Sequence, residues 1–182
     1  LSLDDATLVA DMVQDYWDRY VTDFGFLEPA FTGKLEVCLK SGGSCNGGTS
    51  SSSNRFTVNT ECFCETNSMK KVVGHELFHR VQYSYDGSEV KWFKEGTARA
   101  MEDNAFDDID NWATSMTACS SSFNKEKNDY LNKLGQDITS NGMRYEASCW
   151  WKYFTEQYGS TAAEPQLGVD ALLDLWEAAA TH

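Results

Sequence analysis

The chain has 182 residues, of which 41% are apolar and 13% aromatic, and its formal net charge is −13. A chain of this length can bury one ordinary hydrophobic core, and its aromatic content argues against disorder. The excess of negative charge repels phosphate backbones and anionic lipid headgroups, so we expect neither a nucleic acid nor a membrane as a partner.

The first part of the chain is predicted to form a helix and two strands. Apolar residues recur at steps of three and four over residues 4–22, which indicates an amphipathic helix. Alternating apolar and polar residues predict strands at residues 34–40 and 55–63, the second as the exposed edge of a small sheet. Residues 42–53 are rich in glycine and serine and are interpreted as a flexible loop.

The rest of the chain is predicted to be mainly helical. Hydroxyl and amide side chains at residues 66–68 can cap a helix that ends near residue 85. Strands followed by helices predict an α+β fold. We expect a single domain with two lobes, of about residues 1–87 and 88–182. Further helices are expected at residues 92–105, 144–158 and 169–180, with a region rich in Ser, Asn and Lys after the first of them.

The helix predicted after residue 66 contains the sequence His75-Glu76-Leu77-Phe78-His79. Histidines four residues apart lie on one face of a helix, so both imidazoles can bind the same metal ion, and the glutamate beside the first can act on a bound water. A chain of this composition would contain this pattern about 0.003 times by chance. A core helix that merely holds two histidines is therefore the weaker interpretation.

A catalytic zinc ion usually takes three protein ligands and keeps a fourth position for water. The remaining histidine is His182, the last residue of the sequence, so we expect a carboxylate as the third ligand. Glu95 is the candidate, because the 15 residues between it and His79 leave room for a turn and a returning helix. The alternative is a glutamate that only stabilises the start of its own helix.

With these residues, the chain resembles the gluzincin branch of the zincin metallopeptidases, in which His-Glu-x-x-His is followed by a glutamate ligand on a second helix. The segment Glu95-Gly96-Thr97-Ala98 is similar to the Glu-Gly-x-Ala of its aminopeptidase members. The metzincin pattern does not fit, since Gln82 and Tyr85 stand where that pattern needs glycine and a third histidine. The Gly-Thr-x-Asp segment of the aspzincins is also missing.

The resemblance implies a zincin-like, two-lobed metallopeptidase domain. Its N-terminal lobe would hold a small mixed sheet and the active-site helix, and its C-terminal lobe would be mostly helical. One zinc ion would be held by His75, His79 and Glu95. Glu76 would be the general base.

Two further roles are expected around this centre. Tyr145 begins a Tyr-Glu-Ala segment similar to the Tyr-Glu-Lys-Gly-Ala of the aminopeptidases, which implies that its hydroxyl stabilises the oxyanion. Its alternative role is to pack on the neighbouring lobe. Glu102 follows Glu95 by two helical turns, so we expect it to accept the second ring hydrogen of a zinc-bound histidine.

The resemblance leads us to expect a secreted, zinc-dependent metallopeptidase that hydrolyses peptide bonds through a zinc-bound water. Residues 34–64 lack the Gly-x-Met-x-Asn segment that binds the free amino terminus of aminopeptidase substrates, which favours an endopeptidase. The substrate, a protein or peptide, would add as a strand near residues 55–60 of a monomeric enzyme. The alternative is a catalytically silent or narrowly specific zincin-fold binding module.

The chain has six cysteines, an even number that is typical of exported proteins with disulfides. Cys38 and Cys45 would close a short loop, and the other pairings stay open. A rival hypothesis is a reduced protein in which Cys62 or Cys64 closes a structural zinc site.

An acidic cluster after residue 101 could bind calcium, although it lacks the spacing of a known calcium loop. A plain acidic surface is the alternative. The cluster consists of Glu102, Asp103, Asp107, Asp108 and Asp110.

Overall fold

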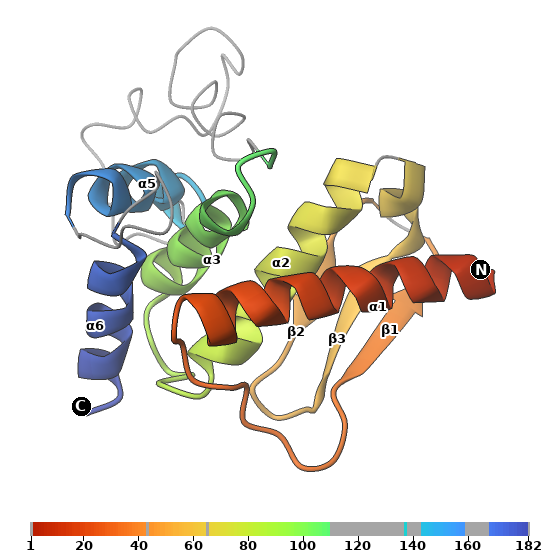
Figure 1. Ribbon diagram of the computed structural model, residues 1–182, viewed down its shortest axis with the longest axis horizontal. Coiled ribbons are helices and arrows are strands. Elements are labelled where there is room, and N and C mark those ends of the chain that lie inside the picture. The colour runs from red at the N-terminus through yellow and green to blue at the C-terminus, as the bar shows by residue number, and fades with distance from the viewer. Residues whose placement is uncertain are drawn as a thin grey trace, which may run out of the picture. The chain divides into compact units, whose positions relative to one another are not determined.

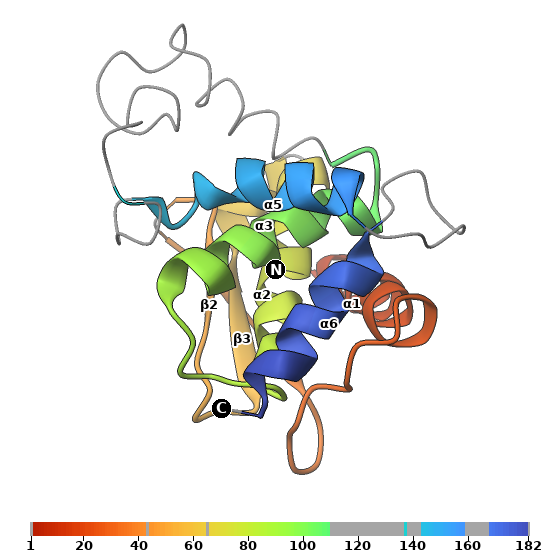
Figure 2. The same ribbon diagram turned by 90° about the vertical axis from the view of Figure 1, so that its left-hand side faces the viewer.

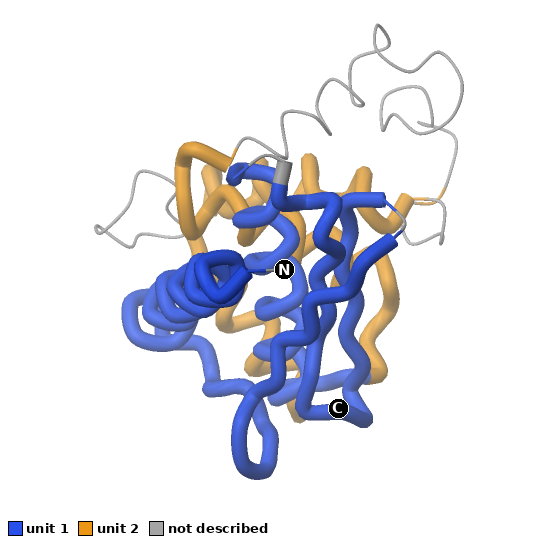
Figure 3. Tube along the Cα trace, turned by 90° about the vertical axis from the view of Figure 1, so that its right-hand side faces the viewer, with its two compact units in different colours: residues 1–87 blue, residues 88–182 orange. Residues whose placement is uncertain are grey.

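The computed structural model describes residues 2–42, 44–64, 66–109, 137, 143–158 and 168–181. The chain divides into two compact units, Leu1–Gly87 and Ser88–His182 (Figure 3). The described residues contain α-helices and one three-stranded mixed sheet, which confirms the predicted α+β class. The region rich in Ser, Asn and Lys lies outside the described residues. The elements are α1 (Leu3–Trp17), η1 (Asp18–Asp23), β1 (Glu36–Lys40), β2 (Gly47–Thr49), β3 (Arg55–Asn59), η2 (Thr60–Cys64), α2 (Thr66–Gln82), α3 (Lys91–Ala105), α5 (Ala147–Gln157) and α6 (Val169–Ala179).

The first helix starts at a capping box. The Oγ of Ser2 accepts a hydrogen bond from the amide of Asp5 at 3.1 Å, and the Asp5 carboxylate accepts one from the amide of Ser2 at 2.8 Å. The hydrogen bond that the Ser2 backbone amide donates, with a further one from the Ser2 side chain, lowers the pKa of the Asp5 carboxyl because it favours the charged form. Helix α1 continues into the π-helix η1, so the helix predicted for residues 4–22 is confirmed with a wider last turn.

The sheet of unit 1 has the strand order β1-β3-β2, with β3 parallel to β1 and antiparallel to β2. The prediction that residues 55–63 form an edge strand was wrong, because β3 is central and ends at Asn59, where the 3₁₀-helix η2 follows. Phe56 and Val58 of β3 are fully buried. The strand predicted at residues 34–40 is confirmed as β1.

The predicted loop at residues 42–53 contains the third strand, β2. Its sequence, Gly47-Gly48-Thr49, has almost no side chains with which to show alternation, so only its pairing with β3 defines it as a strand. This strand is an edge of the sheet in the described part of the chain.

Helix α2 packs against β2 and β3, and α1 packs against α2 (Figure 1). The ring of Phe78 on α2 makes edge contacts with Tyr20 and Phe26, with ring centroids 5.0 and 5.2 Å apart. The hydroxyl of Tyr20 also donates to the carbonyl of Gly74 at 3.2 Å. The helix ends at Gln82 rather than near residue 85. Unit 1 therefore holds α2 between an aromatic cluster and the sheet.

The disulfide of unit 1 joins Cys45 to Cys62. The expected pair of Cys38 and Cys45 was wrong, and Cys38 is a free thiol. Cys45 precedes β2 and Cys62 follows β3, and these two strands are antiparallel neighbours, whereas Cys38 lies on β1 at the other edge of the sheet. Cys149 is also disulfide-bonded. No helix in the described residues is both long and apolar enough to cross a bilayer.

In unit 2, α3 packs against α5, and α5 contacts α6 (Figure 2). Helices α3 and α6 confirm the predictions for residues 92–105 and 169–180, whereas α5 starts three residues later than predicted. A Cβ atom on Gly96 would lie 2.7 Å from Cδ1 of Trp151. Only glycine therefore lets α3 and α5 approach this closely.

A buried ion pair also joins α3 to α5. The ammonium of Lys152 contacts the carboxylate of Asp103 and donates to Oδ1 of Asn104 at 2.8 Å. All three residues are at most 3% exposed. Because a buried charge is costly without a partner, these contacts fix which faces of the two helices meet.

Arg80 connects α2 to two neighbouring loops. Its guanidinium is 1% exposed and donates to the carbonyls of Ser50 and Ser53 at 2.8 and 2.6 Å, and to that of Ala30 at 3.2 Å. Burial lowers the pKa of Arg80, because removal from water disfavours the charged form. The carbonyls offset this cost and hold the turn between β2 and β3 against α2.

We predict that Arg80→Lys lowers the free energy of unfolding by about 2 to 4 kcal/mol, because one ammonium cannot reproduce the planar fork that reaches three carbonyls. Urea unfolding followed by circular dichroism measures the loss. The control is Arg19→Lys, which alters an exposed pair with Asp23 and should change stability by about 0.5 kcal/mol or less. Equal stability of the two variants would show that Arg80 does not anchor the turn.

Candidate metal centre

The two histidines of the His-Glu-x-x-His sequence lie one turn apart on α2. Their ring centroids are 4.6 Å apart and the ring planes are nearly perpendicular, at 88°. His75 is half-buried and His79 is 6% exposed. This confirms the prediction that histidines four residues apart place both imidazole rings on the same face of the helix.

The ring of His79 is held by two neighbours on the same helix or just after it. Its Nδ1 lies 2.7 Å from Oε1 of Gln82, which is itself buried. The ring of Tyr83 stacks on the imidazole, with centroids 6.3 Å apart and planes at 12°. These contacts involve Nδ1 and one ring face, and Nε2 is the other ring nitrogen that could bind a metal ion.

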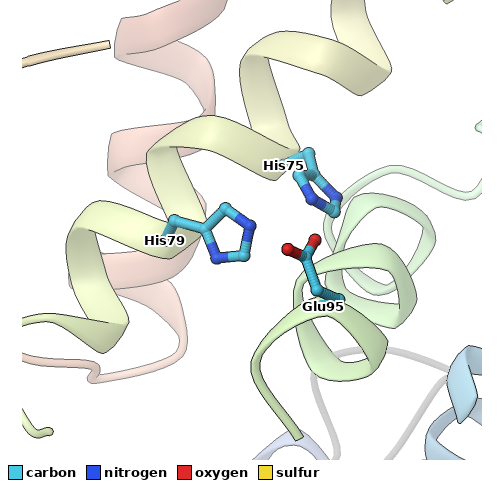
Figure 4. Close-up of side chains that lie close together, drawn as sticks. All are labelled: His75, His79 and Glu95. Atoms are coloured by element: carbon cyan, nitrogen blue, oxygen red, sulfur yellow. The ribbon is translucent and has the colours of Figure 1, made fainter. Parts of the chain in front are cut away.

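Glu95 lies in the first turns of α3 in unit 2 and is half-buried. Ligand atoms of His75, His79 and Glu95 all lie within 4.8 Å of one another, and Figure 4 shows the three side chains converging. Two imidazole nitrogens and one carboxylate oxygen are a donor set that suits zinc. This group could hold a metal ion.

Glu76 lies beside the edge strand of the sheet. It is 6% exposed, and a Cβ atom on Gly47 would lie 2.6 Å from Cγ of Glu76 and 2.8 Å from the carbonyl oxygen of Thr57. The absent side chain at Gly47 thus lets β2 pass directly along this glutamate. The residue predicted as the general base is therefore covered by β2, in a place where water access is restricted.

Tyr145 is half-buried in the turn before α5. The guanidinium carbons of Arg99 and Arg144 lie 5.8 and 4.9 Å from the centre of its ring. Arg99 follows Glu95 by one helical turn on α3. The tyrosine ring therefore lies beside the turn of α3 that follows Glu95.

Glu102 is 2% exposed on α3. That it accepts the second ring hydrogen of a zinc-bound histidine stays a prediction. At His79, the contact that the structure gives for Nδ1 is with Oε1 of Gln82. Gln82 was missed, although residues three apart on a helix are neighbours and the sequence therefore contained the signal.

The acidic cluster forms no metal-binding group among the described residues. Asp103 is paired with Lys152, which removes one carboxylate from the expected calcium site, and Asp110 lies outside the described residues. The alternative of a structural zinc closed by Cys62 is also excluded, because that sulfur is bonded to Cys45.

Comparisons with protein-family models, with curated proteins and with solved structures found no match for this chain. The interpretation of the centre therefore depends on its own residues.

We predict that Glu95→Ala weakens zinc binding by more than about 100-fold, which exceeds the usual cost of losing a group that only supports a ligand. Titration of the metal-free protein with zinc against a chromophoric chelator measures the dissociation constant. Glu156→Ala, at an exposed position of α5, is the control and should bind zinc like the parent. Unchanged affinity in the Glu95 variant would remove this carboxylate from the ligand set.

We further predict that Gly47→Ala lowers the free energy of unfolding by about 1 to 3 kcal/mol, because the new Cβ meets Glu76 and the backbone of β3. The matched control is Gly48→Ala on the same strand, where a Cβ would have only Thr57 Oγ1 nearby, at 3.6 Å. Its stability should stay within about 0.5 kcal/mol of the parent or rise. Thermal unfolding of both variants measures the difference, and equal losses would contradict the close approach of β2 and α2.

Proposed function

We propose that this chain is a secreted, zinc-dependent endopeptidase with a zincin-like catalytic domain of the gluzincin type. The observation that carries the proposal is the convergence of His75, His79 and Glu95 within 4.8 Å, with Glu76 next to the first histidine. The disulfide between Cys45 and Cys62 supports export, because such bonds persist in oxidising compartments. We propose that the enzyme acts as a monomer on proteins or peptides.

The three ligands would hold a zinc ion, which supplies a Lewis acid for the scissile carbonyl and a water of lowered pKa. Glu76 takes a proton from the attacking water and delivers it to the nitrogen of the leaving amine. Its burial beside β2 suits this role, because a carboxylate shielded from bulk water exchanges its proton with the reactants rather than with solvent.

The substrate backbone adds to the free edge of β2. The edge proposed from the sequence, near residues 55–60, is ruled out, because β3 is paired on both sides. Strand β2 runs along Glu76, and a main chain paired with β2 would therefore pass close to the base. Gly47 and Gly48 present no side chains that would block such pairing. Main-chain hydrogen bonds give this mode of binding an affinity that depends little on substrate sequence.

Tyr145 is the proposed donor to the oxyanion. Two arginines contact its ring, and Arg99 adjoins Glu95 along α3. These cationic contacts restrict the ring, which favours a hydroxyl held ready for a developing negative charge.

The experiment is cleavage of an unfolded protein substrate by the zinc-loaded chain and by Glu76→Gln. We expect the parent to cleave and to lose activity with a chelator. The variant should bind one zinc ion and cleave at least about 100-fold more slowly, since it lacks the base. The control is Glu177→Gln at an exposed position on α6, which should keep full activity.

Two other results would count against the proposal. A parent chain that binds one zinc ion and cleaves no substrate would favour the binding module. A chain that binds no zinc would refute the ligand set.

A further inference from the structure

We propose that Gln82 is a positioning residue that sets the zinc affinity of the centre by fixing the tautomer and orientation of His79. The proposal rests on the proposed metal centre, but it does not depend on which reaction the centre performs.

The first argument is the chemistry of the contact between the two side chains. The amide oxygen Oε1 of Gln82 lies 2.7 Å from Nδ1 of His79, and an amide oxygen can only accept a hydrogen bond. Nδ1 therefore carries the proton of the neutral ring. The lone pair is then on Nε2, which is the form that binds a metal ion.

The second argument is burial. His79 is 6% exposed and Gln82 is 1% exposed, so water competes little for this hydrogen bond. A buried imidazole that lost its acceptor would leave an N–H group unsatisfied, which costs more than an ordinary exposed hydrogen bond is worth. The preference for one tautomer is therefore strong.

The third argument is that Gln82 is itself fixed in place. It is the last residue of α2, and its carbonyl accepts the amides of Tyr85 and Asp86, each at 3.0 Å. The ring of Tyr83 stacks on His79 at the same helix end. The imidazole is thus held by a hydrogen bond in its plane and by an aromatic ring along its face.

An amide also differs from the carboxylate that often occupies this place beside a metal-binding histidine. With Glu95 as the charged ligand, a zinc centre would keep one net positive charge, and the neutral Gln82 leaves that charge unchanged. A glutamate here would neutralise it. Gln82 therefore orients the ligand without weakening the electrostatic pull of the centre on a carbonyl oxygen.

The test compares Gln82→Met, which removes the acceptor at similar volume, with Gln82→Glu, which keeps an acceptor oxygen. Zinc titration against a chromophoric chelator should show affinity about 10- to 100-fold weaker in the methionine variant. The glutamate variant should bind zinc at least as tightly as the parent. Val81→Ala is the control for general destabilisation and should keep the parent affinity, because Val81 is a fully buried neighbour on α2 whose hydrocarbon side chain cannot hydrogen-bond to His79.

A second readout uses the metal-free chain and needs no activity. Nitrogen-15 spectra of the imidazoles should show His79 with its proton on Nδ1 in the parent. The methionine variant should lose that preference, and the alanine variant should keep it.

Parent-like zinc affinity and an unchanged tautomer in Gln82→Met would overturn the proposal. Equal loss of affinity in Val81→Ala would do the same, since the effect would then be one of stability. A parent that binds zinc, shows these differences and cleaves nothing would refute the endopeptidase while leaving the role of Gln82 intact.

Discussion

Helix α2 buries four polar side chains within seven residues, and the rest of unit 1 depends on how they are satisfied. The four are Glu76, His79, Arg80 and Gln82. Removing such groups from water is unfavourable unless each forms a hydrogen bond or ion pair in the folded chain, or is placed to bind a ligand. A helix that served only as a core element would carry apolar residues at these positions.

The four side chains make different contacts, some that hold the fold and some at the candidate metal centre. Arg80 turns toward three loop carbonyls and holds the turn that leads from β2 into β3. The side chains of Gln82 and His79 form a hydrogen bond with each other along the helix. Glu76 lies against β2 at Gly47. The anchor at Arg80 thus keeps the edge strand beside the glutamate, so the packing of unit 1 and the geometry of the candidate base have the same origin.

In unit 2, Glu95 lies on α3, and the packing of α3 against α5 fixes this helix. Gly96, the next residue, allows Trp151 of α5 to approach α3 directly, and the ion pair of Lys152 and Asp103 fixes the far end of the same contact. These two features define the face that α3 turns toward α5. The carboxylate of Glu95 is therefore carried by a helix whose rotation is restricted at two points.

The helices, the α+β class and the three candidate ligands could be predicted from sequence patterns alone. Helix periodicity and the spacing of His75 and His79 are local properties, since residues four apart share a face in any α-helix. The position of Glu95 followed from the need for a third ligand and from its motif. Two features could not be predicted and follow from contacts between distant parts of the chain. They are strand β2, whose glycines carry no pattern, and the disulfide of Cys45 and Cys62, which depends on strand pairing. The spacing makes Gln82 a helical neighbour of His79, but its role as the hydrogen-bond partner depends on distance and burial in the folded chain.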